Sequence, residues 1–242
     1  METNYLRADR QQQDFKGEKI VGQYLDKYFY PTFTTTVTRN DDKTTQVEGL
    51  DLTATTDDGY TYTIDEKAAL WYANKELGTF AQEITSRCTG TYNPHCGEIY
   101  NGWAISNTLN DYYVFVWIPE CKTTGKVVNA TDIITADVAL VNKQDMYDWY
   151  HKKGLSASDL LKKSEELRKT VDELGIYNWW DYVTDCTNTA LKQKGYKYHI
   201  NTKTEENTVN ILVSKDIILK QIATYAVRIK EGKIIDTYRK RL

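Results

Sequence analysis

The sequence predicts an α/β or α+β protein in which a mixed central sheet is flanked by helices. Segments whose apolar residues recur at helical spacing alternate with segments rich in β-branched and aromatic residues. The chain has 19 tyrosines, which favour strands, and only 3 prolines. Its 242 residues are 40% hydrophobic and 27% charged, which is the composition of an ordinary globular protein.

The N-terminal half is predicted to begin with a helix over residues 14–29, which Pro31 ends. Strands are expected over residues 34–39, 46–56, 60–70, 79–85 and 103–118. The second and third of these strands flank Asp57-Asp58-Gly59, a tripeptide that suits a three-residue hairpin loop. Within the last strand, residues 112–118 have the continuous apolar character of a buried strand.

After about residue 141 helical patterns become common. A short helix is expected over residues 145–152, and a longer one begins after Ser156 and ends at Gly175. A hairpin of residues 196–202 and 207–213 and a last helix over residues 216–228 follow, before a basic tail at residues 239–241. We therefore expect a core over residues 14–142. The helices and hairpin of residues 143–242 pack on it, as a small lobe or within one single domain.

Composition excludes several classes of protein. The net charge of -3, from 31 basic and 34 acidic residues, excludes a strongly basic nucleic-acid-binding domain but not a local basic patch. The longest uncharged apolar run is too short to span a membrane, and no apolar leader opens the chain. We therefore expect a cytoplasmic protein without membrane association, with reduced thiols.

The hairpin brings two carboxylates and an amine together. If the loop is Asp57–Gly59, Asp51 lies directly opposite Asp65. Strand side chains alternate between faces, so Lys67 shares the face of Asp65, opposite the side-chain-free position Gly49. Two carboxylates this close repel each other unless a positive charge lies between them.

These groups suit metal-assisted hydrolysis. Two carboxylates with backbone oxygens are ligands for a hard divalent cation such as Mg²⁺, and a nearby lysine orients water or stabilises charge on a phosphate. Glu18 lies close to the middle of the apolar face of the first helix, where a carboxylate is unexpected. It would supply a further acid. The residues therefore predict a site for phosphodiester hydrolysis.

The segment Gly49-Leu50-Asp51, a spacer, and then Asp65-Glu66-Lys67 resembles the PD-(D/E)xK motif of restriction-endonuclease-like nucleases. The resemblance covers residues 14–118. It assigns Asp51 and Asp65 to the two acids, Lys67 to the lysine and Glu18 to the acid that many members carry on the first helix. Leu50 replaces the proline of the motif.

The resemblance implies a restriction-endonuclease-like core and a nuclease that depends on Mg²⁺ or Mn²⁺. DNA is favoured over RNA as the substrate, and cleavage of both strands would suggest a homodimer. Some members carry a further glutamine or glutamate after the lysine. Gln82 and Glu83 are candidates on opposite faces of their strand, and we favour Glu83 as an additional metal ligand.

Several alternatives stay open at this stage. The acids and Lys67 can form a solvated strand face, and Glu18 can be a helix-end carboxylate favoured by the helix dipole. The chain can also be a catalytically inactive nuclease-fold protein that serves as a nucleic-acid-binding or assembly module, or a nuclease that is active only in a complex.

Other residues carry weaker signals. Trp71 and Tyr72 can stack on bases, although core packing is favoured, and the tail at residues 239–241 can contact phosphates or extend into solvent. A zinc site is a further candidate, but the spacing of its cysteine and histidine ligands matches no recurring pattern, so free thiols are the preferred interpretation. Its candidate ligands are Cys88, His95, Cys96 and Cys121.

Overall fold

The computed structural model describes residues 17–40, 42, 45–46, 48–88, 96–106, 108–123, 127, 129–175, 188–202 and 207–240, without the side chains of residues 71 and 188–190. The described residues form two compact units. The first draws on the ranges Met1–Leu77, Leu109–Asp145 and Ile218–Leu242, and the second on Gly78–Thr108 and Met146–Ile217. A single division near residue 142 therefore does not separate these units, because the C-terminal strands return to the first.

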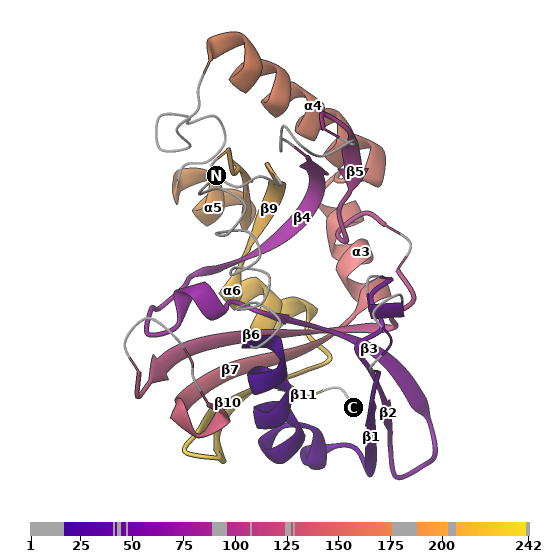
Figure 1. Ribbon diagram of the computed structural model, residues 1–242, viewed down its shortest axis with the longest axis vertical. Coiled ribbons are helices and arrows are strands. Elements are labelled where there is room, and N and C mark those ends of the chain that lie inside the picture. Colours follow the sequence, from indigo (N-terminus) through magenta and orange to yellow (C-terminus); the bar gives the residue numbers. More distant parts are fainter. Residues whose placement is uncertain are drawn as a thin grey trace. The chain divides into compact units, whose positions relative to one another are not determined.

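The first unit contains a mixed seven-stranded sheet (Figure 1). Every neighbouring pair of strands is antiparallel except β3 and β6, which are parallel. The strands lie in the order β1 (Thr36–Arg39), β2 (Leu52–Thr55), β3 (Thr61–Ala68), β6 (Tyr112–Cys121), β7 (Ile133–Asn142), β10 (Tyr225–Lys230) and β11 (Lys233–Lys240). The described part of the chain is thus an α+β protein, as the sequence predicts.

A helix over residues 17–28 covers one face of the seven-stranded sheet, and it is drawn in indigo in Figure 1. Its buried residues Val21 and Leu25 belong to the same apolar cluster as Ile64, Val114 and Leu140 of the sheet. Because strand side chains alternate, the odd-numbered positions of β3 and β6 face the other side. A 3₁₀ turn (η1, Tyr30–Thr32) ends this helical segment, with proline at its start as predicted.

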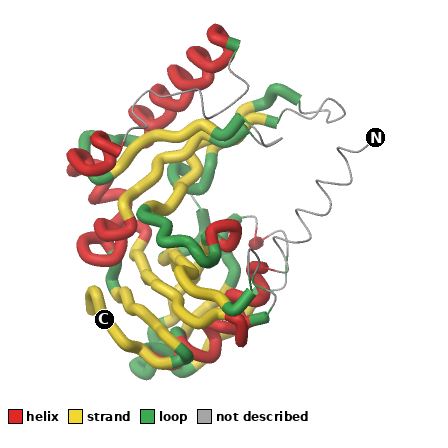
Figure 2. The backbone as a smooth tube through the Cα atoms, turned by 90° about the vertical axis from the view of Figure 1, so that its left-hand side faces the viewer, coloured by secondary structure: helices red, strands yellow, loops and turns green. Residues whose placement is uncertain are grey.

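The second unit contains an antiparallel four-stranded sheet, whose strands appear as yellow tubes in Figure 2. The strands lie in the order β5 (Ile99–Asn101), β4 (Thr79–Arg87), β9 (Val209–Ser214) and β8 (Tyr196–Ile200). The pairing of β8 with β9 confirms the hairpin expected over residues 196–213. The helices of this region are α3 (Lys143–Lys152), which begins in the first unit, α4 (Ala157–Leu174), α5 (Asn188–Lys194) and α6 (Lys215–Ile217).

Helix α4 has the predicted ends. The Ser156 hydroxyl accepts a hydrogen bond from the Asp159 N–H at 3.2 Å, and Gly175 adopts a left-handed conformation with φ of 61°. A buried polar contact joins the helix to β4, because Arg168 donates to Thr85 Oγ1 at 2.9 Å. Arg168 also donates to Asn207 Oδ1 at 2.7 Å, which ties the helix to the loop before β9.

The C-terminal segment differs from the prediction of a helix over residues 216–228. Helical structure ends with a π-helical turn (η5, Ile218–Ile222), and β10 and β11 follow as a hairpin. Tyr225, Val227 and Ile229 of β10 all enter the apolar cluster, which is the two-residue period of a strand. The predicted tail is also wrong for residues 239 and 240, since both belong to β11.

Two further strand predictions need correction, and β5 and β7 were not predicted. The strand expected over residues 46–56 begins at Leu52, and the one expected over 103–118 begins at Tyr112. Strand β7 is buried along most of its length. Short 3₁₀ turns, η2 (Leu70–Tyr72) and η3 (Ala130–Asp132), follow β3 and precede β7. No helix among the described residues is both long and apolar enough to cross a membrane.

Candidate functional site

Strands β2 and β3 pair in the predicted register. Leu52 lies opposite Ile64 and Thr55 opposite Thr61. The register breaks at the next residue, because the Asp51 N–H donates to the Ile64 carbonyl at 3.0 Å, although Ile64 is already the partner of Leu52. The Asp51 carboxyl group nevertheless lies close to that of Asp65, since the charge of Asp65 and a side-chain hydrogen bond between the two groups act on it.

The ladder ends at Leu52, and the carboxylate of Asp51 accepts a hydrogen bond from the next backbone donor of β3. The Glu66 N–H donates to Asp51 Oδ2 at 2.7 Å. The Leu50 carbonyl, which a continued ladder would place opposite Glu66, instead accepts from the Asn40 side chain at 2.8 Å. Gly49 is therefore not paired opposite Lys67, contrary to the expectation, and it lies in a turn with φ of 84°.

Asp65 and Lys67 form a largely buried ion pair. The distance from Lys67 Nζ to Asp65 Oδ1 is 2.7 Å, and the side chains are 29% and 2% exposed, respectively. The Asp65 carboxylate is also within hydrogen-bond reach of the Asp51 carboxyl group. A buried carboxylate in this state retains the capacity to accept further ligands.

The surroundings of Asp51 strongly perturb its pKa. Burial and the charge of Asp65 together raise the pKa of Asp51 from 3.8 to about 8, against the opposing effects of Lys67 and the Glu66 N–H. Burial lowers the pKa of Lys67, but the charges of Asp65, Asp51 and Glu18 outweigh this effect and raise it above its usual value. Near neutral pH, Lys67 is thus a cation, and Asp51 holds a proton that a metal ion could replace.

The sequence suggested that Glu18 lies within the apolar face of the helix, and the structure contradicts this. Its side chain is exposed in the first described turn of the helix. This turn lies against the segment that follows β3, because a Cβ added to Gly17 would be 2.4 Å from Leu70 Cδ1. Glu18 is near enough for its charge to act on Lys67. However, no group of three or more Asp, Glu, His or Cys side chains among the described residues converges to hold a metal ion.

Glu83 belongs to β4 of the second unit, in a different sheet from Asp51 and Asp65. Its carbonyl accepts from the Ala104 N–H at 2.9 Å, and its charge acts on Arg168. Gln82 is fully buried and accepts a hydrogen bond from the Tyr150 hydroxyl. The role of Glu83 as a metal ligand stays a prediction.

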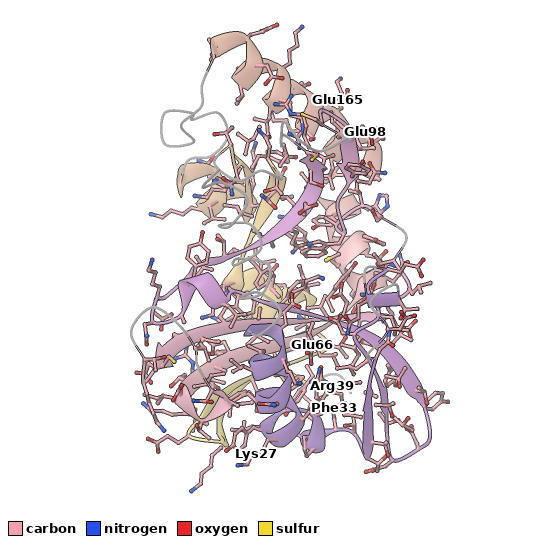
Figure 3. All side chains as sticks on the ribbon, viewed as in Figure 1. Lys27, Phe33, Arg39, Glu66, Glu98 and Glu165 are labelled. Carbon is pink, nitrogen blue, oxygen red and sulfur yellow. The ribbon has the colours of Figure 1, made fainter. Side chains whose placement is uncertain are left out.

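On the opposite face of β3, Glu66 is held by a network that the sequence did not indicate. Tyr30 donates to Glu66 Oε1 at 2.7 Å, and Arg39 donates to Glu66 Oε2 at 3.0 Å. Arg39 also pairs with Asp26 of the helix at 2.8 Å. Figure 3 labels Glu66 and Arg39 side by side between the helix and the sheet. The network anchors Glu66, whose N–H positions Asp51. The only sequence signal for the place of Glu66 was that it is adjacent to Asp65 and therefore points to the opposite face.

The other weak candidates belong to different parts of the chain. Cys88, Cys96 and Cys121 are free thiols, and the first two lie in the second unit. His95 and the side chain of Trp71 lie outside the described residues. Tyr72 is 49% exposed.

Comparisons with models of protein families, with curated proteins and with solved structures found no match. The chemistry must therefore follow from the site itself. It offers two neighbouring carboxylates, an ammonium group within 2.7 Å of one of them, and a backbone N–H that fixes the other. This arrangement can bind a cation and stabilise negative charge on a phosphate.

Proposed function

We propose that this chain is a divalent-metal-dependent nuclease that hydrolyses phosphodiester bonds, with DNA as the favoured substrate. The observation that carries the proposal is the buried acid pair with an adjacent ammonium. Asp51 lies close to Asp65, and the pKa of Asp51 is raised to about 8 by burial and by this neighbour. Proteins seldom maintain such repulsion without a functional reason, and the resemblance to the PD-(D/E)xK motif indicates the reaction.

Asp51 and Asp65 would hold Mg²⁺ or Mn²⁺. The fit rests on the donor set, because the buried Asp65 carboxylate lies beside the Asp51 carboxyl group and within 2.7 Å of Lys67. Mg²⁺ is commonly bound by one or two carboxylates, with waters and substrate phosphates completing its ligands, so a third protein acid is not required. When bound, the ion would neutralise charge on the phosphate and lower the pKa of a coordinated water.

The chain itself would position the reactants. The Lys67 ammonium would orient the attacking water and stabilise charge at the scissile phosphate. It would not act as a base, because its raised pKa keeps it protonated. The Glu66 N–H would keep Asp51 in place, and Glu18 would assist through its charge or through water.

The order of elements supports a restriction-endonuclease-like core in the first unit. A helix precedes the hairpin that carries the acids and the lysine, and β3 pairs in parallel with β6. One difference from the expected order is that β4, the strand directly after the motif, belongs to the other sheet. The core would therefore be formed by β2, β3, β6 and β7.

A cleavage assay tests the proposal. Plasmid, single-stranded DNA and RNA are incubated with the protein in Mg²⁺ or Mn²⁺, and parallel reactions contain EDTA. Lys67→Met and Asp65→Asn should lower the cleavage rate by at least about 10²-fold, the effect of removing one electrostatic stabiliser. Lys27→Met is the matched control, because Lys27 lies on the helix that covers the other face (Figure 3). Absence of metal-dependent cleavage, or equal cleavage by Lys67→Met, would overturn the proposal.

The second candidate is a nuclease-fold protein without turnover that binds nucleic acid or takes part in an assembly. Two observations favour it: the net charge is -3, and the described residues contain no group of three acids that could hold a metal. It predicts no cleavage in this assay, and binding of the same DNA in a gel-shift measurement at a level that Asp65→Asn does not change.

A further inference from the structure

Lys143 lies near the acid pair through the register of three strands. Ile64 of β3 pairs with Tyr112 of β6, which pairs with Asn142 of β7. Lys143 follows Asn142 directly and begins helix α3. Residues 64, 112 and 142 form one row across the three strands. Lys143 therefore belongs to the next row, which contains residue 63 and lies on the side of Ile64 away from Asp65.

Backbone and side-chain contacts fix this position. The Lys143 N–H donates to the Asp111 carbonyl at 2.9 Å, and the Asp111 N–H donates to the Thr63 carbonyl at 2.9 Å. The Asn142 carboxamide oxygen accepts from the Gln144 N–H at 2.9 Å, which holds the first turn of α3. Lys143 thus shares a row with Asp111 and Thr63, two positions along the sheet from Asp65.

Lys67 and Lys143 consequently flank Asp65 from opposite directions. Lys67 lies two residues beyond Asp65 along β3, and the row of Lys143 lies two residues before it. Asp65 pairs with Tyr113, which pairs with Val141, so Asp65 and Val141 lie on the same face of the sheet. Position 143 is two residues after Val141, and alternation along the strand assigns it to that same face. Burial lowers the pKa of Lys143, while the charges of Asp111 and Asp65 oppose this effect, so Lys143 lies near enough to Asp65 for their charges to interact.

We propose that Lys143 stabilises the negative charge that develops on the leaving oxygen during phosphodiester hydrolysis. This inference rests on the proposed nuclease function. An in-line displacement places the attacking and leaving oxygens on opposite sides of the phosphorus. A phosphate bound through the cation that Asp51 and Asp65 would hold would have Lys67 on the side of the water and Lys143 on the side of the leaving group.

The step balances with water as the only co-reactant. A bond forms between the water oxygen and phosphorus, and the bond between phosphorus and the leaving sugar oxygen breaks with its electron pair on that oxygen. One proton of the water ends on the leaving oxygen, which becomes a hydroxyl group, and the other belongs to the phosphate product. The Lys143 ammonium lowers the barrier while the leaving oxygen carries charge.

A comparison of leaving groups tests this role. Thymidine 5′-(p-nitrophenyl) phosphate releases nitrophenolate, an anion that needs little stabilisation, whereas DNA releases a sugar alkoxide. Lys143→Met should lower the cleavage rate of DNA by about 10²-fold or more. The same variant should lower the rate on the nitrophenyl ester by less than about tenfold, since the charge there needs less stabilisation. Lys67→Met should slow both substrates, Lys143→Arg should restore part of the rate on DNA, and Lys27→Met should slow neither.

The outcomes separate the two proposals. An equal loss on both substrates in Lys143→Met, or no loss on DNA, would overturn the role of Lys143 while the nuclease proposal stands. If the wild-type protein cleaves neither substrate in Mg²⁺ or Mn²⁺, both proposals fall. Circular dichroism of each variant confirms that a lost rate does not reflect a lost fold.

Discussion

Replacing Asp51 with asparagine should stabilise the metal-free protein while it removes the proposed metal ligand. In the folded protein the pKa of Asp51 is raised from 3.8 to about 8, first by burial and then by the charge of Asp65. Asparagine has nearly the same shape, carries no charge, and keeps an oxygen that can accept the hydrogen bond from the Glu66 N–H, which is 2.7 Å long in the wild type. The substitution therefore removes the repulsion and preserves the local contact.

The pH dependence fixes the sign and the size of this effect. Because the pKa is higher in the folded state, the folded protein binds more protons than the unfolded chain between about pH 4 and pH 8. The contribution of Asp51 to stability is complete below this window and is lost as the pH rises through it, by at most roughly 1.4 kcal/mol per pH unit. Asp51→Asn should equal the wild type near pH 4 and exceed it by up to about 4 kcal/mol at pH 7.

Urea denaturation in EDTA at pH 4, 5.5 and 7, followed by circular dichroism, measures this difference. Asp57→Asn is the matched control, because it changes an exposed aspartate in the loop of the same hairpin. The control should follow the wild-type pH dependence. The reasoning would be refuted if Asp51→Asn were no more stable than the wild type at pH 7, or if the advantage did not grow with pH.

Three further substitutions test the structure. Lys67→Met should destabilise the protein by about 2–3 kcal/mol in urea denaturation, because it leaves Asp65 buried without its cation, and the double variant with Asp65→Asn should recover most of this loss. Asp137→Asn should lower the free energy of unfolding by about 2–3 kcal/mol, because Asp137 is fully buried and accepts two hydrogen bonds from Arg228, at 2.7 and 2.8 Å. Ser156→Ala should cost about 1 kcal/mol in thermal or urea denaturation, since it removes the N-cap of α4. An effect near zero in any of these measurements would contradict the corresponding contact.

The acid pair could be predicted because its geometry depends on local signals. The loop Asp57–Gly59 fixes the register of the hairpin, and this register pairs Leu52 with Ile64, the neighbours of Asp51 and Asp65. The alternation of side chains then assigns Lys67 to the same face. The ends of α4 were predictable for the same reason, since a capping serine and a left-handed glycine are signals within a single turn.

Features that depend on distant parts of the chain were not predictable in this way. The position of Lys143 follows from the pairing of β3 with β6 and of β6 with β7, and no residue near Lys143 indicates either pairing. The assignment of Glu83 to a separate sheet likewise depends on its pairing with Asn210 of β9. At the C-terminus, Ile218, Leu219 and Ile222 have helical spacing and lie directly before β10, so that the helical pattern merges with the strand.

The most direct test of the proposed metal site is a calorimetric titration of the protein with Mn²⁺ at pH 7 in two buffers of different ionisation enthalpy. We expect one ion to bind per chain, with release of the proton that Asp51 holds, so the measured heat should differ between the buffers. Asp51→Asn should abolish the buffer dependence and weaken binding, and Asp57→Asn should change neither. Absence of binding to the wild-type protein, or binding that Asp51→Asn leaves unchanged, would contradict the account.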